Sequence, residues 1–426
     1  MQVIRYPEQN DWPNFLKRPY SDATAAQTAA QQIIEAVRTG GDVALRRFSK
    51  QFDNVAITEL CVSDTEKRNA EKLVPENLKT AIHHAKKNIE TFHAAQQPEL
   101  KKIETSPGIT CWQKSIAIEK VGLYIPGGTA PLFSTVLMLG VPAQLAGCSE
   151  IILCTPPDKS GAIHPAILYT AKLCGIEEVY KTGGAQAIAA MAFGTETIPA
   201  VYKIFGPGNQ YVTAAKQLVQ LHGIAIDMPA GPSEVCVLAD DTAFPHFVAA
   251  DLLSQAEHGS DSQVMLISTS ESVVKNVLQE LEKQVSVLPR KTVATAALQN
   301  SNAIVVRTIE EAIALVNEYA AEHLILACAD AETIAEKIKT AGSVFIGNWS
   351  PESAGDYASG TNHTLPTNAF ARAYSGVSLD SFFKKVTFQK LTREGLQGIA
   401  QTVTTMAEAE GLQAHAEAVK VRLSEP

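Results

Sequence analysis

The chain has 426 residues, of which 46% are hydrophobic and 19% are charged, and this composition is typical of a globular protein with more than one domain. Its 36 basic and 45 acidic residues give a formal net charge of -9, and no basic run is present, which argues against general binding to nucleic acid. The apolar stretch at residues 131–154 is interrupted by polar residues and a proline, so it does not predict a membrane span.

Seven cysteines are scattered along the sequence without a CxxC pair. The first residues, MQVIRYPEQNDW, lack the basic and apolar pattern of a signal peptide. Both observations predict a reduced, cytoplasmic protein. No cysteine has the basic or histidine-rich neighbourhood that would support a catalytic thiol.

The first hundred residues are predicted to be largely helical. Residues 21–39 have potential caps in Ser21 and Asp22 and a stop at Gly40-Gly41, and residues 75–96 form a second helical pattern. From about residue 116, short β-branched runs alternate with alanine-rich helical segments; the runs are AIEKVGLYI, EIILCT, EVYKT, VYKIFG and IAIDMP. This βαβα order predicts a parallel sheet with helices on both faces.

A second group of strand candidates follows, separated by four helical segments: EVCVLAD, QVMLIST, AIVVRT, HLILAC and SVFIGN. The sequence therefore predicts an α/β fold with two parallel-sheet halves. Neither half contains GxGxxG, and the nearest match is Gly206-Pro207-Gly208-Asn209, so both are expected to be incomplete versions of the Rossmann arrangement. The segment after about residue 378 has no strand pattern and is predicted to be a helical arm.

Two further glycine-rich turns follow strand candidates and precede helices: Tyr124-Ile125-Pro126-Gly127-Gly128 and Gly183-Gly184-Ala185-Gln186. The amino terminus of a helix at such a turn can bind a phosphate group. Close packing alone is an equally available explanation of these glycines.

Four possible metal ligands lie far apart in the sequence: Gln255, His258, Asp356 and His415. The first two are three residues apart near the end of a helix that Gly259 would terminate, which places both on one helical face. Each residue taken singly has an ordinary structural interpretation, such as a histidine that complements the carbonyl end of a helix. Because HExxH and paired-cysteine motifs are absent, spacing alone does not establish a metal site.

Glu322 and His323 lie between a helical pattern and the strand candidate HLILAC. A carboxylate beside an imidazole can activate water and shuttle protons at neutral pH. A histidine near helix carbonyls is the alternative, and the residues alone leave both open. Residues 350–363, rich in Gly, Ser, Asp and Asn, are expected to form a long irregular loop with a functional role.

Taken together, these motifs resemble the histidinol dehydrogenase family over nearly the whole chain. The matching segments are GLYIPGG, GGAQAIAA, KIFGPGN, MPAGPSEV, LLSQAEHG, EHLI, GSVFIGNWSPESAGDYASGTNHTLPT and AEGLQAH. The resemblance implies an oxidoreductase of the last step of histidine biosynthesis. Such an enzyme oxidises L-histidinol to L-histidine through histidinaldehyde and reduces two NAD.

The resemblance also implies roles for particular residues. Glu322 is expected to polarise the attacking water and His323 to transfer protons. One Zn²⁺ per subunit is expected on Gln255, His258, Asp356 and His415. Contacts to NAD are expected from Tyr124, Gln186 and Asn209. Contacts to the substrate are expected from Ser233, Gln255, His258, His323, Asp356, Glu410 and His415.

The resemblance further implies a homodimer in which Glu410 and His415 are supplied across the interface. The expected domains are an arm at residues 1–24, a first α/β domain at 25–122 with 235–377, an inserted domain at 123–234 that carries the NAD loops, and a helical dimerisation arm at 378–426.

Two details of this sequence qualify the resemblance. Glu410 and His415 are separated by about 140° on a regular helix, so a shared site predicts a helix break near Gly411. The family commonly has a proline before the Glu-His pair, whereas this chain has Ala321, which leaves φ unrestricted there.

Two other functions remain open at this point. A zinc hydrolase would use Glu322 and His323 to activate water without a redox cofactor, but it leaves the two glycine-rich α/β halves unexplained. The other is a metal- or nucleotide-binding scaffold without activity; against it, each ligand and acid–base position that matches the family holds the expected residue type. The nitrogen and oxygen donors also suit manganese or cobalt, so the sequence does not fix the metal.

Overall fold

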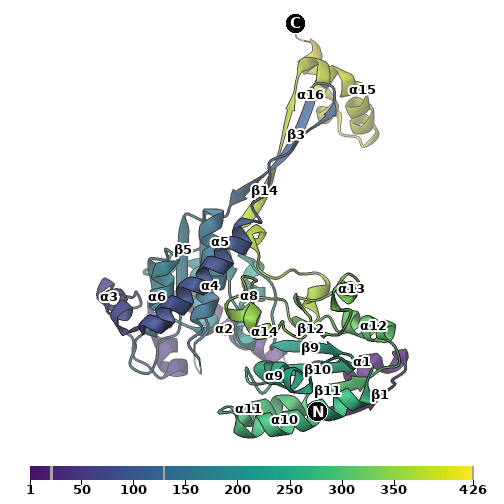
Figure 1. The fold of residues 1–426 in the computed structure, drawn as a ribbon. Helices are drawn as coiled ribbons and strands as arrows, with labels where there is room; N and C mark the ends of the chain where they lie inside the picture. The colour runs from purple at the N-terminus through teal and green to yellow at the C-terminus, as the bar shows by residue number, and fades with distance from the viewer. Residues whose placement is uncertain (20–22, 128–129, 425–426) are drawn as a thin grey trace. The chain divides into compact units, whose positions relative to one another are not determined.

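The computed structural model describes residues 1–19, 23–127 and 130–424 (Figure 1). The chain divides into two compact units. The larger unit comprises Met1–Gln96 and Glu119–Ser381, and the smaller comprises Gln97–Ile118 and Phe382–Pro426. Ser21, Asp22 and Gly128, which the sequence analysis named, lie outside the described residues.

The larger unit contains a five-stranded parallel sheet in the order β6-β5-β4-β7-β8. Its strands are β4 (Lys120–Tyr124), β5 (Glu150–Thr155), β6 (Glu178–Lys181), β7 (Lys203–Phe205) and β8 (Ala225–Ile226). The connecting helices are α5 (Phe133–Ala146), α6 (Pro165–Leu173), α7 (Gly184–Phe193) and α8 (Gln210–Gln220). The chain adds β5 and β6 on one side of β4 and β7 and β8 on the other, so the winding reverses between β4 and β7.

Three amino-terminal helices pack on the helices of this sheet: α2 (Ala23–Phe48) on α7 and α8, α3 (Asp64–Leu73) on α6, and α4 (Glu76–Ala94) on α5. The predicted stop at Gly40-Gly41 is an interruption of α2, because Gly41 has φ of +48° and the helix then resumes. The second helical pattern, predicted at residues 75–96, corresponds closely to α4.

The same unit contains a six-stranded parallel sheet in the order β1-β11-β10-β9-β12-β13. Its strands are β1 (Gln2–Arg5), β9 (Glu234–Ala239), β10 (Gln263–Ser268), β11 (Asn302–Val305), β12 (His323–Ala327) and β13 (Ser343–Ile346). Its helices are α9 (Pro245–Ala256), α10 (Glu271–Val287), α11 (Lys291–Gln299), α12 (Ile309–Tyr319) and α13 (Ala331–Ala335).

Both faces of the six-stranded sheet are buried. Along β9, Val235 and Val237 belong to one hydrophobic cluster, while Cys236 and Leu238 belong to another. This alternation follows from the two-residue period of a strand. Burial on both faces explains why its strands read as continuous apolar runs in the sequence.

The predicted α/β fold with two parallel sheets is confirmed. Strand β1 is an addition, because the sequence analysis expected only an arm at the start of the chain. The four-part domain division remains a prediction. No helix in the described part of the chain has the length and apolar character needed to cross a bilayer.

The smaller unit contains a three-stranded antiparallel sheet in the order β14-β3-β2, with β2 at Lys102–Ser106, β3 at Ile109–Ala117 and β14 at Phe383–Leu391. The prediction of no strand after residue 378 is therefore wrong. Most side chains of β14 are exposed, so the strand lacks the apolar alternation that reveals a strand with one buried face. Its stability comes from pairing with β3, where the Phe388 and Trp112 rings stack with centroids 5.4 Å apart.

Two helices complete the smaller unit: α15 (Arg393–Ala409) and α16 (Gln413–Ser424). Between them Gly411 has φ of +73°, which confirms the predicted break.

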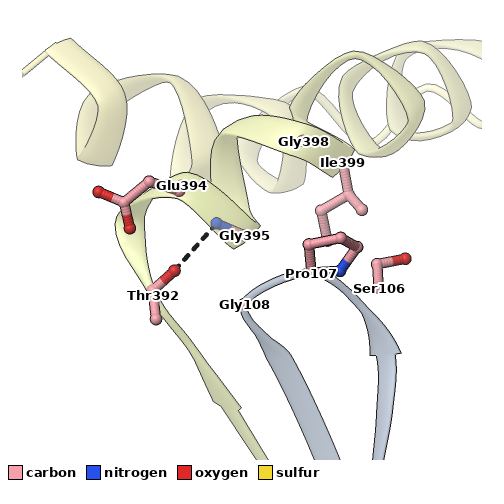
Figure 2. A pocket seen from close by; sticks show the side chains of 8 residues that line it. All are labelled: Ser106, Pro107, Gly108, Thr392, Glu394, Gly395, Gly398 and Ile399. Carbon is pink, nitrogen blue, oxygen red and sulfur yellow. Dashed lines mark hydrogen bonds between the residues drawn. The ribbon is translucent and has the colours of Figure 1, made fainter.

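A hollow lies beside the start of α15, where the Thr392 hydroxyl accepts a hydrogen bond of 3.1 Å from the Gly395 N–H (Figure 2). A Cβ at Gly395 would lie 2.5 Å from the carbonyl oxygen of Gly108, so the turn between β2 and β3 needs this glycine for its close approach to the helix. The predicted site residues are not among those that line this hollow: Ser106, Pro107, Gly108, Thr392, Glu394, Gly395, Gly398 and Ile399.

Candidate active site

The Glu322-His323 pair lies at the amino end of β12, beside the amino end of β9. Helix α12 ends at Tyr319, and Ala320 then adopts a left-handed conformation with φ of +53° that turns the chain from helix to strand. Ala321, the position of the family's proline, is held by a 3.0 Å hydrogen bond from the Gly342 N–H to its carbonyl oxygen. Backbone pairing therefore fixes the segment before Glu322 without the restricted φ of a proline.

Glu322 is buried, and its carboxylate accepts hydrogen bonds from two neighbouring groups. Its Oε2 accepts from the Glu234 N–H at 2.9 Å and from Nε2 of Gln255, in the last turn of α9, at 3.3 Å. Burial raises the pKa of Glu322 to about 7, in spite of the charge of the nearby His323 and the bond from the Glu234 N–H. A carboxyl group with such a pKa exchanges protons near neutral pH.

His323 is buried with its two ring nitrogens in different surroundings. Nδ1 lies 3.2 Å from the carbonyl oxygen of Glu234, which can only accept, so the hydrogen on Nδ1 donates to it. Nε2 faces Oδ1 of Asp356 at 3.5 Å. Burial alone would lower the pKa of His323, but the carboxylates of Glu322, Glu352 and Asp356 together outweigh it and raise this pKa to about 10.

Asp356 lies on a short helix, α14 (Glu352–Tyr357), within the segment 350–363 that was expected to be irregular. Residues on either side of this helix are irregular, as expected. The carbonyl oxygen of Asp356 is 2.9 Å from Nδ1 of His363, whose Nε2 lies 3.1 Å from the Thr135 hydroxyl on α5. Burial would raise the pKa of the Asp356 carboxyl, but the neighbouring histidines outweigh burial and lower it.

The structure brings several expected metal ligands into this centre. Gln255 contacts Glu322, His323 faces Asp356, and His258 lies in the turn after α9, where its N–H bonds the carbonyl oxygen of Gln255 at 3.2 Å. Although His258 is exposed to solvent, the protein around its ring partly desolvates it and lowers its pKa, which favours the neutral imidazole that binds metals.

Four buried polar atoms of this centre have no hydrogen-bond partner: Gln255 Oε1, His323 Nε2, Glu352 Oε2 and Asp356 Oδ1. Buried polar atoms are normally paired, so this gathering marks a place built for a ligand or an ion. The amide and carboxylate oxygens, with the neutral imidazole of His258, are donors that suit zinc.

Three further polar residues of the centre escaped the sequence analysis: Glu234, Glu352 and His363. Glu352 is 1% exposed, and burial raises its pKa to about 8. Its position four residues before Asp356, on one helical face, was the available signal. Glu234 acts through its backbone, which no side-chain pattern reveals.

The expected NAD contacts lie at the carboxyl edge of the five-stranded sheet, where the winding reverses. Tyr124 ends β4, Asn209 follows β7, and Gln186 lies in the first turn of α7. The Tyr124 hydroxyl accepts a 3.1 Å hydrogen bond from the Gly184 N–H, and burial raises the pKa of Tyr124 to about 12. Asn209 caps α8, because its Oδ1 accepts from the N–H groups of residues 211 and 212 at 3.0 and 3.1 Å.

Gly206 shapes the loop between β7 and α8, which contains Asn209 and passes close to Tyr124. Its φ is +126°, and a Cβ would lie 2.0 Å from the carbonyl oxygen of Tyr124. Both sides of this residue are held: its N–H donates to Oδ2 of Asp227 at 2.8 Å, and its carbonyl accepts from Nζ of Lys216 at 2.8 Å. Lys216 and Asp227 form a buried ion pair.

The glycines of the other two turns have a packing role. Added Cβ atoms at Gly127 and Gly183 would lie 2.3 and 2.5 Å from the ring of Pro156. This observation favours the packing explanation for these two positions.

The remaining predicted site residues are placed as follows. Ser233 precedes β9, and its carbonyl oxygen accepts from the Gln263 N–H at 3.2 Å. Glu410 and His415 belong to the smaller unit, exposed on either side of the break between α15 and α16. Within residues 1–19, 23–127 and 130–424, no group of three or more His, Cys, Asp or Glu is arranged to hold a metal.

The structure has the features of an α/β enzyme with two separate regions. One is a loop shaped by glycine at the winding reversal of the five-stranded sheet, where cofactors commonly bind, and the other is a buried acid–base pair on the six-stranded sheet. A model of the family described as histidinol dehydrogenase matches residues 16–423. The chain belongs to the histidinol dehydrogenase family, and it is therefore an oxidoreductase.

Similar proteins agree over the full length. A histidinol dehydrogenase of Bacteroides fragilis is 59% identical over 425 residues, covering 100% of this chain and 99% of the relative. One of Bacteroides thetaiotaomicron is 58% identical over 424 residues, again covering 100% and 99%. The crystal structure of histidinol dehydrogenase from Elizabethkingia anophelis is 57% identical, with a TM-score of 0.97 and coverage of 99% of this chain and 98% of that chain. These comparisons do not favour the hydrolase alternative.

Proposed function

We propose that this protein oxidises L-histidinol to L-histidine through histidinaldehyde, with reduction of two NAD, as the last step of histidine biosynthesis in the cytoplasm. The family match over residues 16–423 supports the substrate. The observation that carries the chemistry is the buried Glu322-His323 pair, surrounded by polar atoms that have no partner. One acid–base centre of this kind can serve both oxidations.

Zinc fits the donors of this centre. Gln255 Oε1 and Asp356 Oδ1 are buried without a hydrogen-bond partner, with Nε2 of His323 facing the latter at 3.5 Å, and the lowered pKa of His258 favours its metal-binding form. We assign these three residues and His415 as ligands. Zinc on them would hold the imidazole and amine nitrogens of histidinol and, through its charge, lower the pKa of the nearby His323.

The protein's own residues supply the proton transfers. In the first oxidation the substrate carbon loses a hydride and its hydroxyl loses a proton, which Nε2 of His323 accepts. The bond from Nδ1 to the Glu234 carbonyl keeps the ring in the tautomer that leaves Nε2 free. In the second oxidation Glu322 takes a proton from the water that attacks the aldehyde, and the hydrated aldehyde then loses its hydride to give the acid.

NAD is proposed to bind at the winding reversal of the five-stranded sheet, where it accepts each hydride. Tyr124, Gln186 and Asn209 are proposed to contact it. Helices α7 and α8 begin at this edge, and the partial positive charge of their amino termini favours phosphate groups.

A homodimer is proposed to complete the site. Glu410 and His415 lie on either side of the Gly411 break, and both are exposed, so they are available to a second copy. Together with Ser233, they are proposed to contact the substrate. If each chain contributes His415 only to the site of its partner, an isolated subunit lacks a ligand and should be inactive.

The decisive experiment counts NADH formed per L-histidinol consumed, before and after chelation. Two NADH per histidinol, lost with the chelator and restored by zinc, is the expected result. One NADH would mean that the aldehyde leaves the site and would contradict the role of Glu322. No NADH from the zinc-loaded protein would overturn the proposed function.

A further inference from the structure

Behind the Glu322-His323 pair lies a buried ion pair between Arg18 and Glu234. The Arg18 guanidinium donates to both carboxylate oxygens of Glu234, from Nε at 2.9 Å and from Nη2 at 3.1 Å. The side chains are 15% and 2% exposed, so the pair is shielded from water. Two-point contact between a guanidinium and a carboxylate fixes orientation as well as distance.

Glu234 is the residue whose backbone contacts both members of the catalytic pair. Its N–H donates to Oε2 of Glu322 at 2.9 Å, and its carbonyl accepts from Nδ1 of His323 at 3.2 Å. A shift of Glu234 would therefore move both the N–H that donates to Glu322 and the carbonyl that accepts from His323. The side chain of Glu234 is also bonded at 2.9 Å by the N–H of Asn368, so its carboxylate is anchored from two directions.

Arg18 also holds the chain that leads into the catalytic pair. Its Nη2 donates to the carbonyl oxygen of Tyr319 at 2.5 Å, and its guanidinium lies 4.1 Å from the centre of the Tyr319 ring. Tyr319 is the last residue of α12, three positions before Glu322. Its hydroxyl donates to Oε1 of Gln263 at 2.9 Å, which ties the same ring to the start of β10.

We propose that Arg18, through Glu234 and Tyr319, is a positioning residue for Glu322 and His323. One guanidinium connects the start of β9 to the end of α12, and these are the two segments whose relative placement sets the acid–base geometry. The inference rests on the proposed function, since it assumes that Glu322 and His323 transfer protons in histidinol oxidation. Displacements of about 1 Å at a reacting centre lower rates roughly 100-fold, so a loosened connection should be visible in kcat.

The test compares Arg18→Lys and Glu234→Gln with the wild-type chain in its zinc-loaded form. Lysine keeps the charge but cannot bond both carboxylate oxygens and the Tyr319 carbonyl at once. Both variants are expected to lower kcat roughly 10- to 100-fold, while the KM for NAD stays within about twofold. Arg5→Lys, at the exposed pair with Glu271, is the matched control and should leave kcat unchanged.

Three measurements separate positioning from loss of fold or metal. Zinc content and thermal unfolding give the fraction of loaded, folded sites, and kcat is expressed per such site. Added guanidinium at a concentration that leaves the fold intact should restore part of the kcat of Arg18→Ala, because it can reoccupy the place between Glu234 and Tyr319.

Activity of the wild-type chain separates the two proposals. If the wild type forms no NADH from histidinol, the proposed function fails. If the wild type is active but Arg18→Lys and Glu234→Gln keep its kcat per folded, loaded site, the positioning role is overturned. A fall in activity that disappears after correction for zinc content or folded fraction also overturns it.

Discussion

The two sheets of the larger unit present opposite edges to their proposed ligands. The five-stranded sheet uses its carboxyl edge, where Tyr124 ends β4 and Asn209 follows the neighbouring β7. The six-stranded sheet uses its amino edge, where Glu234 and His323 begin neighbouring strands. Ligands of open α/β sheets usually bind at the carboxyl edge, so only the five-stranded sheet follows the general rule.

Helix polarity explains the division. At the carboxyl edge of a parallel sheet helices begin, and α7 and α8 bring partial positive charge to the place proposed for the NAD phosphates. At the amino edge helices end, and α9 and α12 bring partial negative charge next to Gln255 and Glu322. The edge that departs from the rule is thus the edge that favours a metal ion and an ammonium group.

The two edges also differ in the material from which they are built. The edge proposed for NAD, called the NAD edge below, depends on backbone in an unusual conformation at Gly206. The acid–base edge is made of buried side chains with raised pKa values. Each edge is supported by one buried ion pair, Lys216–Asp227 in the first case and Arg18–Glu234 in the second.

The largest effect is expected at the acid–base edge. Glu322→Gln removes the carboxylate proposed to activate water and should lower the rate of the second oxidation about 1,000-fold. The yield should then fall from two NADH per histidinol to one. The histidinaldehyde that accumulates can be trapped with an amine reagent. The exposed Glu310→Gln on α12 is the control and should behave as wild type. Two NADH at the wild-type rate from Glu322→Gln would contradict the assignment.

At the NAD edge the largest effect is expected from backbone strain. Gly206→Ala would place a Cβ 2.0 Å from the Tyr124 carbonyl oxygen at φ of +126°, so it should destabilise the chain by about 3 kcal/mol or more. Gly223→Ala is the matched control, because its φ is +85° but no atom lies within 4 Å of the added Cβ. Its cost should be about 1 kcal/mol. Urea unfolding measures both, and equal costs would show that the contact with Tyr124 relaxes.

The sequence predicted some elements of the fold and missed others. The parallel sheets were predictable, because strands buried on both faces are apolar along their length and alternate with helices. Strand β14 was missed because its exposed side chains carry no periodic signal. The Gly411 break was predicted from the angular separation of Glu410 and His415 on a helix.

The site residues show the same limit. Spacing placed Gln255 and His258 together at the end of α9, but it left both with ordinary structural interpretations. Only the family resemblance joined them to Asp356, which lies about a hundred residues away in sequence. The role of Glu234 was out of reach, because its backbone groups contact Glu322 and His323 and any residue type has such groups.

A smaller effect is expected from the ion pair at the NAD edge. Asp227→Asn keeps an oxygen that can accept from the Gly206 N–H but removes the charge beside Lys216. The loop should loosen, and the KM for NAD should rise about tenfold, equivalent to about 1.4 kcal/mol. The KM for histidinol should stay unchanged, in contrast to the effect of Arg18→Lys on kcat. A rise in both KM values would show that the two edges are not independent.

The smallest effect is expected at Asp42, which lies on α2 and belongs to neither edge. Its carboxylate accepts from the Thr197 hydroxyl at 2.5 Å and lies 3.6 Å from the Arg46 guanidinium. Burial would raise the pKa of Asp42, but the hydrogen bonds from Thr197 and Thr195 and the charge of Arg46 lower it. The ionised form therefore stabilises the fold above the unfolded pKa of about 3.9, and this contribution is lost as pH falls through the lower folded value.

Asp42→Asn should thus reduce the free energy of unfolding by about 1 kcal/mol at pH 7. The difference from wild type should stay constant down to about pH 4 and shrink below it, as the wild-type carboxylate takes up a proton. Urea unfolding across this range measures the difference, while kcat and both KM values should remain those of the wild type. A changed KM for NAD would mean that α2 supports the NAD edge through its packing on α7 and α8. That result would contradict the prediction that Asp42 affects stability alone.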